Sequence, residues 1–297
     1  MKKYLPLLLA VIAIGLLTAC GGDDDASPTP TTSSGQQTPT VALPTGPTPT
    51  RTPVSVPIIA EITVFAASSL TGAFTQIGED FEAAYPGFGV NFNFSGSQDL
   101  RTQLEQGAQA DVFASADNVQ MEAASQSGLV TGQRNIFAHN KLVIIVPKAN
   151  EANIKTPQDL AKAGIKLMIA GENVPAGRYT RQFLDAVSAT ASFGAGYKSA
   201  VLANVVSEAS NVKEVAAAVQ LDEVDAGVVY ITDVTDVIAD DVTTIDIPEA
   251  VNQTAAYPIS LTYSGFSSEA PQLFMDYVLD DLGQETLASF GFTKVDQ

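Results

Sequence analysis

An apolar strand runs directly into an amphipathic helix at Ile62-Thr63-Val64-Phe65-Ala66-Ala67-Ser68-Ser69-Leu70. The apolar run that ends at Ala66 predicts the strand, and apolar residues at helical spacing from Leu70 to Tyr85 predict the helix. A serine between the two is a natural N-cap. Because a helix start presents unpaired N–H groups and a partial positive charge, this joint is a potential anion site that needs no lysine or arginine.

The first 57 residues differ in composition from the rest of the chain. Residues 1–19 have a basic start and an apolar core too short for a comfortable membrane span, which is typical of a signal peptide. Cys20, the only cysteine, follows in a context that resembles the lipidation site of bacterial lipoproteins. Residues 20–57 are rich in Pro, Thr, Ser and Gly and predict a disordered tether. The protein is therefore expected outside the cytoplasm, attached to the cell membrane through a lipid on Cys20.

Residues 58–297 are long enough for one large domain or two lobes. They carry the whole formal net charge of −18, because the few charges of the first 57 residues cancel. An acidic surface disfavours nucleic acid as a partner, since binding phosphates requires clustered Lys and Arg. It does not disfavour a small anion in a cleft, where local dipoles outweigh distant screened charges.

Strand-like and helix-like segments alternate along this part of the chain. Strands are expected at about 62–66, 90–94, 111–115, 141–146, 166–170, 226–231 and 257–263. Helices are expected at about 70–85, 98–106, 117–126, 156–163, 175–188, 211–221 and 269–290. The alternation predicts α/β layers with mixed, mostly parallel sheets. In such sheets ligands bind at the carboxyl ends of the strands.

Few residues are suited to catalysis or metal binding. The single histidine, His139, and the single cysteine cannot build a zinc site. His139 is interpreted as a polar residue just before a strand, because no Gly-x-Ser-x-Gly segment supplies a serine nucleophile. No glycine-rich phosphate-binding motif is present. We therefore expect neither an enzyme nor a cofactor.

Small or hydroxyl residues directly precede a predicted helix in four loops. They are Ser68-Ser69; Ser95-Gly96-Ser97; Gly171-Glu172-Asn173-Val174-Pro175-Ala176-Gly177; and Ser210-Asn211-Val212. Ser97 is expected to be an N-cap, Gly96 to allow close backbone approach, and Pro175 to occupy a first helical position. One such loop means little, because every helix needs a cap. Four loops near equivalent sheet edges indicate an oxyanion site.

An ordered set of short segments also resembles a known family. The set includes Val64-Phe65-Ala66-Ala67-Ser68-Ser69-Leu70, Phe94-x-x-Ser97, Ala110-Asp111-Val112-Phe113-Ala114-Ser115-Ala116-Asp117, Val174-Pro175-Ala176-Gly177, Gly227-Val228-Val229-Tyr230 and Tyr257-Pro258-Ile259. It resembles the molybdate-binding component of bacterial molybdate ABC importers, a periplasmic-type solute-binding family, here in lipoprotein form.

The resemblance implies a type II fold with two α/β lobes, a two-strand hinge and an oxyanion held between the lobes. Lobe 1 is expected to span about 58–138 plus 259–297, and lobe 2 about 139–258. The matching positions imply five ligand-binding residues, namely Ser69, Ser97, Ala176, Val212 and Tyr230. Hydroxyls would donate at the serines and the tyrosine, and backbone N–H groups at Ala176 and Val212. Ser68 adds a second hydroxyl, and whether it touches the ligand stays open.

These five groups are all hydrogen-bond donors, which suits a fully ionised tetrahedral dianion. Monohydrogen phosphate carries a proton and would need an acceptor, which only Asp99 or Glu172 nearby in sequence offers. The leading hypothesis is therefore a monomeric receptor that delivers molybdate or tungstate to an ABC permease. The alternatives are the same fold binding sulfate or another oxyanion, an exported hydrolase, and an adhesive surface lipoprotein.

Overall fold

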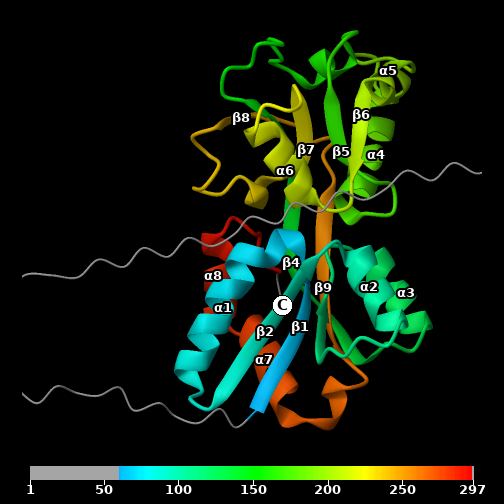
Figure 1. Ribbon diagram of the computed structural model, residues 1–297. Coiled ribbons are helices and arrows are strands. Elements are labelled where there is room, and N and C mark those ends of the chain that lie inside the picture. Colours follow the sequence, from blue (N-terminus) through cyan, green and yellow to red (C-terminus); the bar gives the residue numbers. More distant parts are fainter. Residues whose placement is uncertain (1–59, 296–297) are drawn as a thin grey trace, which may run out of the picture. The chain divides into compact units, whose positions relative to one another are not determined.

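Nine strands form one mixed sheet in the computed structural model, which describes residues 60–295 (Figure 1). The predictions of a signal peptide, a lipidated Cys20 and a tether lie outside the described residues. The strands are β1 (Ala60–Ala67), β2 (Phe88–Ser95), β3 (Val112–Ala114), β4 (Val130–Pro147), β5 (Leu167–Ala170), β6 (Val205–Ala209), β7 (Ala226–Tyr230), β8 (Val242–Asp246) and β9 (Thr254–Thr262). Their order is β2-β1-β3-β9-β4-β7-β5-β6, with β8 also paired to β4.

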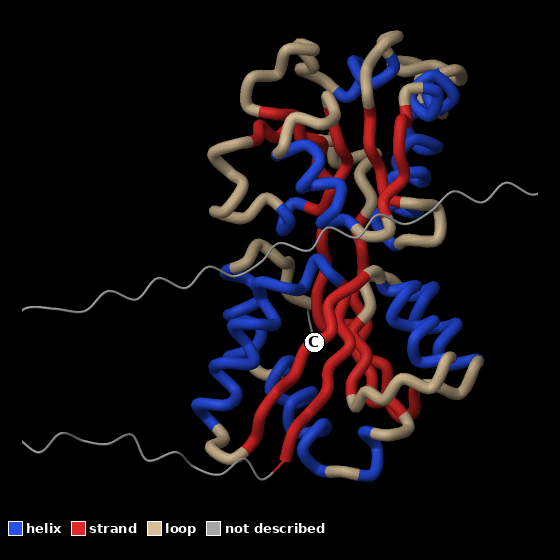
Figure 2. Tube along the Cα trace, viewed as in Figure 1, coloured by secondary structure: helices blue, strands red, loops and turns tan. Residues whose placement is uncertain are grey.

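Eight α-helices are found in the described part of the chain. They are α1 (Thr71–Ala84), α2 (Ser97–Glu105), α3 (Asn118–Gln126), α4 (Pro175–Ser188), α5 (Tyr197–Ala203), α6 (Val212–Gln220), α7 (Glu269–Leu279) and α8 (Asp281–Ser289). Figure 2 shows these helices on both sides of the strands in each half of the sheet. No helix within residues 60–295 is long and apolar enough to cross a membrane.

The first lobe is built around β1, which pairs in parallel with β2 and β3. Ile62, Val64 and Ala66 join the core formed with α1 and α7, whereas Phe65 points into a smaller cluster with Leu100 of α2. Because β1 is buried on both faces, its sequence reads as a continuous apolar run rather than an alternating one. That run is what identified the strand in the sequence.

The second lobe is built around β5, which pairs in parallel with β6 and β7. Helices α4 and α6 pack against these strands, and Figure 1 shows them in the half of the sheet that also contains β8. Both lobes thus have three parallel strands whose carboxyl ends lead into loops and helices. This is the arrangement in which open α/β sheets bind ligands.

Strands β4 and β9 connect the two lobes. β4 pairs with β9 from Val130 to Lys141 and then, from Leu142, with β7 of the second lobe. The two-lobed, mixed α/β architecture with a two-strand connection is therefore confirmed (Figure 1). Parallel pairings are half of the eight rather than most of them, because β4 and β9 run antiparallel to every neighbour.

Several predicted elements need correction. The helix expected at 156–163 is a short 3-10 turn, Pro157–Ala161, stopped by the extended backbone of Lys162. The closing helices expected within 269–290 are confirmed as α7 and α8, which meet at Asp280, whose side chain caps α8. β4 begins eleven residues before the apolar run at Lys141, since its first half is only partly buried and therefore polar. Helix α5 and strands β6 and β8 were not predicted.

Candidate anion-binding site

Loops from both lobes converge on one small pocket. It is lined by Ala67, Ser68, Ser69, Ser95, Gly96, Ser97, Ala116, Val174, Pro175, Ala176, Val212 and Tyr230. The structure thus brings together all five residues predicted from the sequence, namely Ser69, Ser97, Ala176, Val212 and Tyr230. The cavity volume is about 10 Å³, which is near the space that one water molecule needs. In this state the pocket is nearly closed.

Ser69 lies in a 3-10 turn, Ser68–Leu70, inserted between β1 and α1. The prediction that a serine here caps the helix is wrong, because neither the turn nor α1 has a side-chain cap. The Ser69 Oγ instead lies 2.9 Å from the hydroxyl of Tyr257 on β9. The inserted turn points this side chain toward the sheet, which leaves it buried beside the pocket.

Ser97 is the first residue of α2, and its predicted role as N-cap is also wrong. Gly96 is the N-cap residue, and no side chain caps this helix. The Ser97 Oγ accepts a hydrogen bond of 3.0 Å from the backbone N–H of Ala116. The close approach expected at Gly96 is confirmed, because a Cβ there would lie 2.5 Å from the carbonyl oxygen of Ser210 in the second lobe.

The second lobe contributes the starts of two helices. Helix α4 begins at Pro175, as predicted, and α6 begins at Val212 after the N-cap Asn211. Ala176 and Val212 lie in first turns, where backbone N–H groups have no intrahelical acceptor. Gly177 lets α4 start against the end of β5, since a Cβ there would lie 2.0 Å from the carbonyl oxygen of Gly171. Two helix N-termini therefore face the pocket with free donors and partial positive charge.

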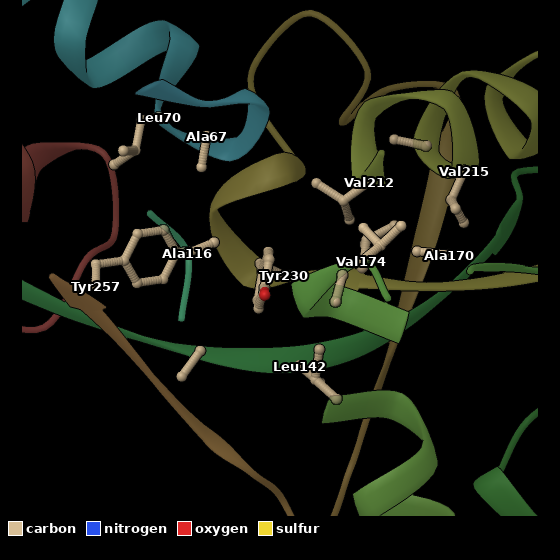
Figure 3. Packing of buried hydrophobic residues seen from close by; sticks show 14 of the residues in the cluster. Ala67, Leu70, Ala116, Leu142, Ala170, Val174, Val212, Val215, Tyr230 and Tyr257 are labelled. Atoms are coloured by element: carbon tan, nitrogen blue, oxygen red, sulfur yellow. The ribbon is translucent and has the colours of Figure 1, made fainter. Parts of the chain in front are cut away.

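Tyr230 ends β7 and is 1% exposed. Its hydroxyl has no hydrogen-bond partner among the described residues. Figure 3 shows this hydroxyl among Ala116, Val174 and Val212. Burial is the main reason that the pKa of Tyr230 is raised well above 10.0, so the group remains a neutral donor at physiological pH. A buried hydroxyl without a partner costs free energy and calls for a ligand or water oxygen.

Two basic side chains lie one or two residues after the backbone donors, but neither lines the pocket. Arg178 of α4 forms an ion pair with Asp117, and Lys213 of α6 lies 3.2 Å from Asp233. Both aspartates are 1% exposed. Burial raises the pKa of Asp233, and the nearby Lys213 opposes that rise. Each cation is thus matched by a buried carboxylate, which leaves the pocket lining itself without a formal charge.

The Arg178–Asp117 pair is one of several contacts between the lobes. Asp117 is the N-cap of α3 in the first lobe, where it also accepts from the backbone of Gln120. The Gln120 side chain donates to the carbonyl oxygen of Asn173 at 3.0 Å. The Gln98 side chain donates to the carbonyl oxygen of Ser210 at 2.8 Å. These contacts hold the lobes together around the pocket.

No Asp, Glu or His side chain lines the pocket. Within residues 60–295 no three His, Cys, Asp or Glu side chains are placed to hold a metal ion. Asp99 and Glu172, the acceptors considered from the sequence, do not line the cavity, and neither does His139. His139 lies inside β4, where its backbone pairs with Thr293.

Sequence reasoning missed the groups that hold the serines. Tyr257 was quoted only as part of a motif, and Asn140, which donates to its hydroxyl at 3.3 Å, was not singled out. Tyr257 lies within the mostly buried β9, and that setting was the available signal, whereas Asn140 stands between the polar His139 and Lys141 of β4 and carried none. The backbone donor at Ala116 carries no sequence signal, since any residue there except proline has an N–H.

Fold and pocket together define a two-lobed binding protein with a small site at the carboxyl ends of its parallel strands. Residues 62–293 match the family of bacterial extracellular solute-binding proteins, and the chain belongs to that family. It is 35% identical over 287 residues to the molybdate-binding protein ModA of Mycobacterium tuberculosis (strain ATCC 25618 / H37Rv), covering 97% of this chain and 96% of that relative.

Solved structures agree with this assignment. The substrate-binding domain of a putative molybdenum ABC transporter from Clostridium difficile has a TM-score of 0.59 and 27% identity, covering 80% of this chain and 100% of that one. The sulfate-binding protein SubI of Mycobacterium tuberculosis H37Rv has a TM-score of 0.73 at 16% identity, covering 80% of this chain and 88% of that one. The latter likeness concerns the fold alone.

Proposed function

We propose that this protein is an extracytoplasmic receptor that binds molybdate or tungstate and delivers it to the permease of an ABC importer. The five predicted residues would hold the oxyanion. Relatives named as molybdate-binding proteins support this choice of ligand, since the likeness to the M. tuberculosis protein extends over nearly the whole of both chains. The receptor binds its cargo unchanged and is not an enzyme.

The unpaired Tyr230 hydroxyl is the observation that carries the proposal. It is buried without a partner and faces a cavity that two helix N-termini also face. A bound oxygen anion would satisfy all three groups at once. Helix N-termini bind anions through their free N–H groups and partial positive charge, and hydrogen bonds to a charged acceptor are stronger than those between neutral groups.

The chemistry of the lining favours a dianion without protons. Every polar group considered as a ligand contact is a donor, and no carboxylate lines the cavity. Burying a dianion is costly unless its oxygens are satisfied by hydrogen bonds. Molybdate, tungstate and sulfate offer only acceptors, whereas monohydrogen phosphate also brings a proton that needs an acceptor.

The size of the pocket favours an inorganic ion. A cavity volume of about 10 Å³ contrasts with the 300–1,000 Å³ typical of sites for organic ligands. A small tetrahedral ion needs only a slight separation of the lobes, and an organic phosphate would need a large one. β4 and β9 would act as the hinge, with lobe 1 at about 58–138 plus 259–297 and lobe 2 at about 139–258.

The proposal includes membrane attachment. A signal peptide at 1–19, a lipid on Cys20 and a tether at 20–57 would hold a monomeric receptor near its permease. Labelling of Cys20 by a radioactive fatty acid in cells, and its loss in Cys20→Ala, is the expected result. Release of an unlabelled protein from cells would contradict this part alone.

Calorimetric titration of the purified protein with molybdate, tungstate, sulfate and phosphate tests the proposal. We expect molybdate and tungstate to bind most tightly and phosphate least. Ser69→Ala should weaken molybdate binding by about 1–3 kcal/mol, the usual loss for a hydrogen bond to a charged group. Ser260→Ala is the matched control, because it removes a buried hydroxyl of the same lobe that lies outside the pocket.

Two outcomes would change the assignment. Preferential binding of sulfate would keep the fold and the site but replace the ligand. Failure of all four ions to bind would reject the proposed function.

A further inference from the structure

We infer that Tyr257 and Asn140 are positioning residues that fix the direction in which Ser69 donates its hydrogen bond, and that they thereby make the pocket select oxyanions without a proton. The inference rests on the proposed function of the pocket. Tyr257 and Asn140 do not line the cavity, so they would act only through Ser69.

The orientation of the Asn140 amide is set by its neighbours. Its Oδ1 accepts a hydrogen bond of 2.9 Å from the backbone N–H of Lys141. Because a backbone N–H can only donate, the oxygen must face it and the NH₂ group must face the other way. That NH₂ group lies 2.8 Å from the Thr232 Oγ1 and 3.3 Å from the Tyr257 hydroxyl.

The Tyr257 hydroxyl therefore accepts a hydrogen bond from Asn140 and has its own proton left to donate. Among the described residues, the acceptor within hydrogen-bond distance is the Ser69 Oγ, at 2.9 Å. Tyr257 is fully buried, and burial raises its pKa far above the usual value. The ring thus keeps its proton at every physiological pH, and the direction of the bond from Tyr257 to Ser69 is fixed.

The proton of Ser69 is then not used within the fold. Its oxygen accepts from Tyr257, so its O–H is available to donate into the pocket that it lines. Ser97 is held by a backbone group instead of a side chain. Its Oγ accepts a hydrogen bond of 3.0 Å from the N–H of Ala116. Of the four serines that line the pocket, Ser69 and Ser97 therefore have a proton available for a ligand.

The direction of these hydrogen bonds disfavours an oxyanion that carries a proton, such as monohydrogen phosphate. A fully ionised oxygen accepts from the oriented serine, whereas a P–OH group would place its proton against the serine proton. If the serine turned a lone pair toward the P–OH group, its own proton would swing either against the Tyr257 hydroxyl, which already donates to it, or away from any acceptor, and in both cases a buried hydrogen bond would be lost. Removing the Tyr257 hydroxyl frees the position that it occupies, so the Ser69 proton can turn there without opposing another donor while a lone pair faces the ligand.

Tyr257→Phe tests the inference through selectivity rather than affinity alone. Calorimetry at about pH 8, where the second proton of a phosphate group is already lost, would measure molybdate binding directly and phosphate binding by competition. We expect the ratio of molybdate to phosphate affinity to fall about tenfold or more, on the order of one net hydrogen bond. Molybdate should bind more weakly, and phosphate no more weakly than to the unmodified protein.

Matched variants separate positioning from a general structural effect. Tyr197→Phe removes a buried hydroxyl that donates to the carbonyl oxygen of Pro157, away from the pocket, and it should leave the ratio unchanged. In a Ser69→Ala background, Tyr257→Phe should not change the ratio of molybdate to phosphate affinity any further, because Tyr257 acts on the ligand only by orienting the Ser69 hydroxyl. Asn140→Ala keeps the Tyr257 ring and should lower the ratio in the same direction by a smaller factor.

The possible results distinguish this inference from the proposed function. An unchanged ratio in Tyr257→Phe, with molybdate still bound by the unmodified protein, would overturn the inference and leave the proposed function intact. Equal effects of Tyr257→Phe with and without Ser69 would overturn it as well. Absence of molybdate, tungstate and sulfate binding to the unmodified protein would overturn both.

Discussion

The two sides of the pocket supply donors by different means. The first lobe uses the side-chain hydroxyls of Ser69 and Ser97, each already held by a bond from Tyr257 or from the backbone of Ala116. The second lobe uses the backbone of two helix starts and the Tyr230 hydroxyl, which has no partner in the described structure. The serines are held by Tyr257 of the connecting strand β9 and by the backbone of the first lobe itself, whereas the Tyr230 hydroxyl has no such partner.

This difference assigns separate tasks to the lobes. The first lobe presents hydroxyls that are already held in place, at Ser97 by its own backbone and at Ser69 by the connecting strand β9, so this side fixes which kind of ion is accepted. The second lobe gains its missing hydrogen bonds only when an oxygen anion is present, so a ligand favours the closed arrangement of the lobes over an open one. Selection therefore belongs mainly to the first lobe and closure mainly to the second.

Arg178→Gln should have the largest effect, because it breaks the buried pair that joins the lobes. Asp117 would then be buried without a counter-charge in the closed state, and removal of one partner from a buried pair costs about 3–5 kcal/mol. We expect most of this cost to appear as weaker molybdate binding, measured by calorimetry. Arg181→Gln is the control, since Arg181 pairs with Glu208 within the second lobe. Equal losses in the two variants would contradict a role of Arg178 in closure.

Tyr230→Phe should weaken binding without destabilising the protein. The hydroxyl has no partner to lose in the described structure, so the melting temperature without ligand should stay the same or rise. Binding should weaken by about 1.5–3 kcal/mol, the contribution of a hydrogen bond to a charged group. A fall in melting temperature with unchanged affinity would mean that the hydroxyl serves the fold and not the ligand.

Val212→Pro should test the backbone donor of α6 by itself. Val212 is the first helical residue, where proline is tolerated, and the preceding Asn211 has the extended backbone that precedes proline well. Loss of the N–H should cost about 1 kcal/mol more in binding than Val212→Ala, which keeps the N–H and removes side-chain volume. Identical affinities of the two variants would exclude this N–H as a contact.

Alkaline pH should have the smallest effect on binding. Burial raises the pKa of Tyr230 well above 10.0 and raises that of Tyr257 as well, so molybdate affinity should be level from neutral pH to about pH 10. Stability without ligand behaves differently. Both raised pKa values stabilise the fold below the unfolded value near pH 10, and this contribution is lost as the pH rises further. A loss of affinity near pH 9 would show that a tyrosine ionises early.

Much of the fold is predictable because its decisive elements carry strong local signals. β1 is mostly apolar from Ile62 onward because both of its faces are buried there, and α4 begins at the predicted Pro175 because proline suits a first helical position. The first half of β4 is half-exposed and lacks such a signal. Its pairing with β9 joins residues far apart in the chain, and local composition does not encode that register.

For the candidate site, the sequence predicts which residues line the pocket but not the hydrogen bonds that hold them. The loops that gather in the pocket were identified from their small and hydroxyl residues, whereas the helix caps predicted at the Ser68-Ser69 joint and at Ser97 were wrong. In each case a contact from a distant residue, Tyr257 or Ala116, outcompetes the local cap. The ion pair between Arg178 and Asp117 likewise depends on how the lobes pack. The two residues are far apart in the sequence, so their spacing along the chain does not predict the contact.

A crystal structure of the protein grown with molybdate tests the central claim most directly. The account predicts one tetrahedral ion in the pocket, with its oxygens within hydrogen-bond distance of the Ser69 and Ser97 hydroxyls, the Ala176 and Val212 backbone nitrogens and the Tyr230 hydroxyl. No carboxylate and no Lys or Arg side chain should touch it. An ion bound elsewhere, or one held in this pocket by Arg178 or Lys213, would contradict the account.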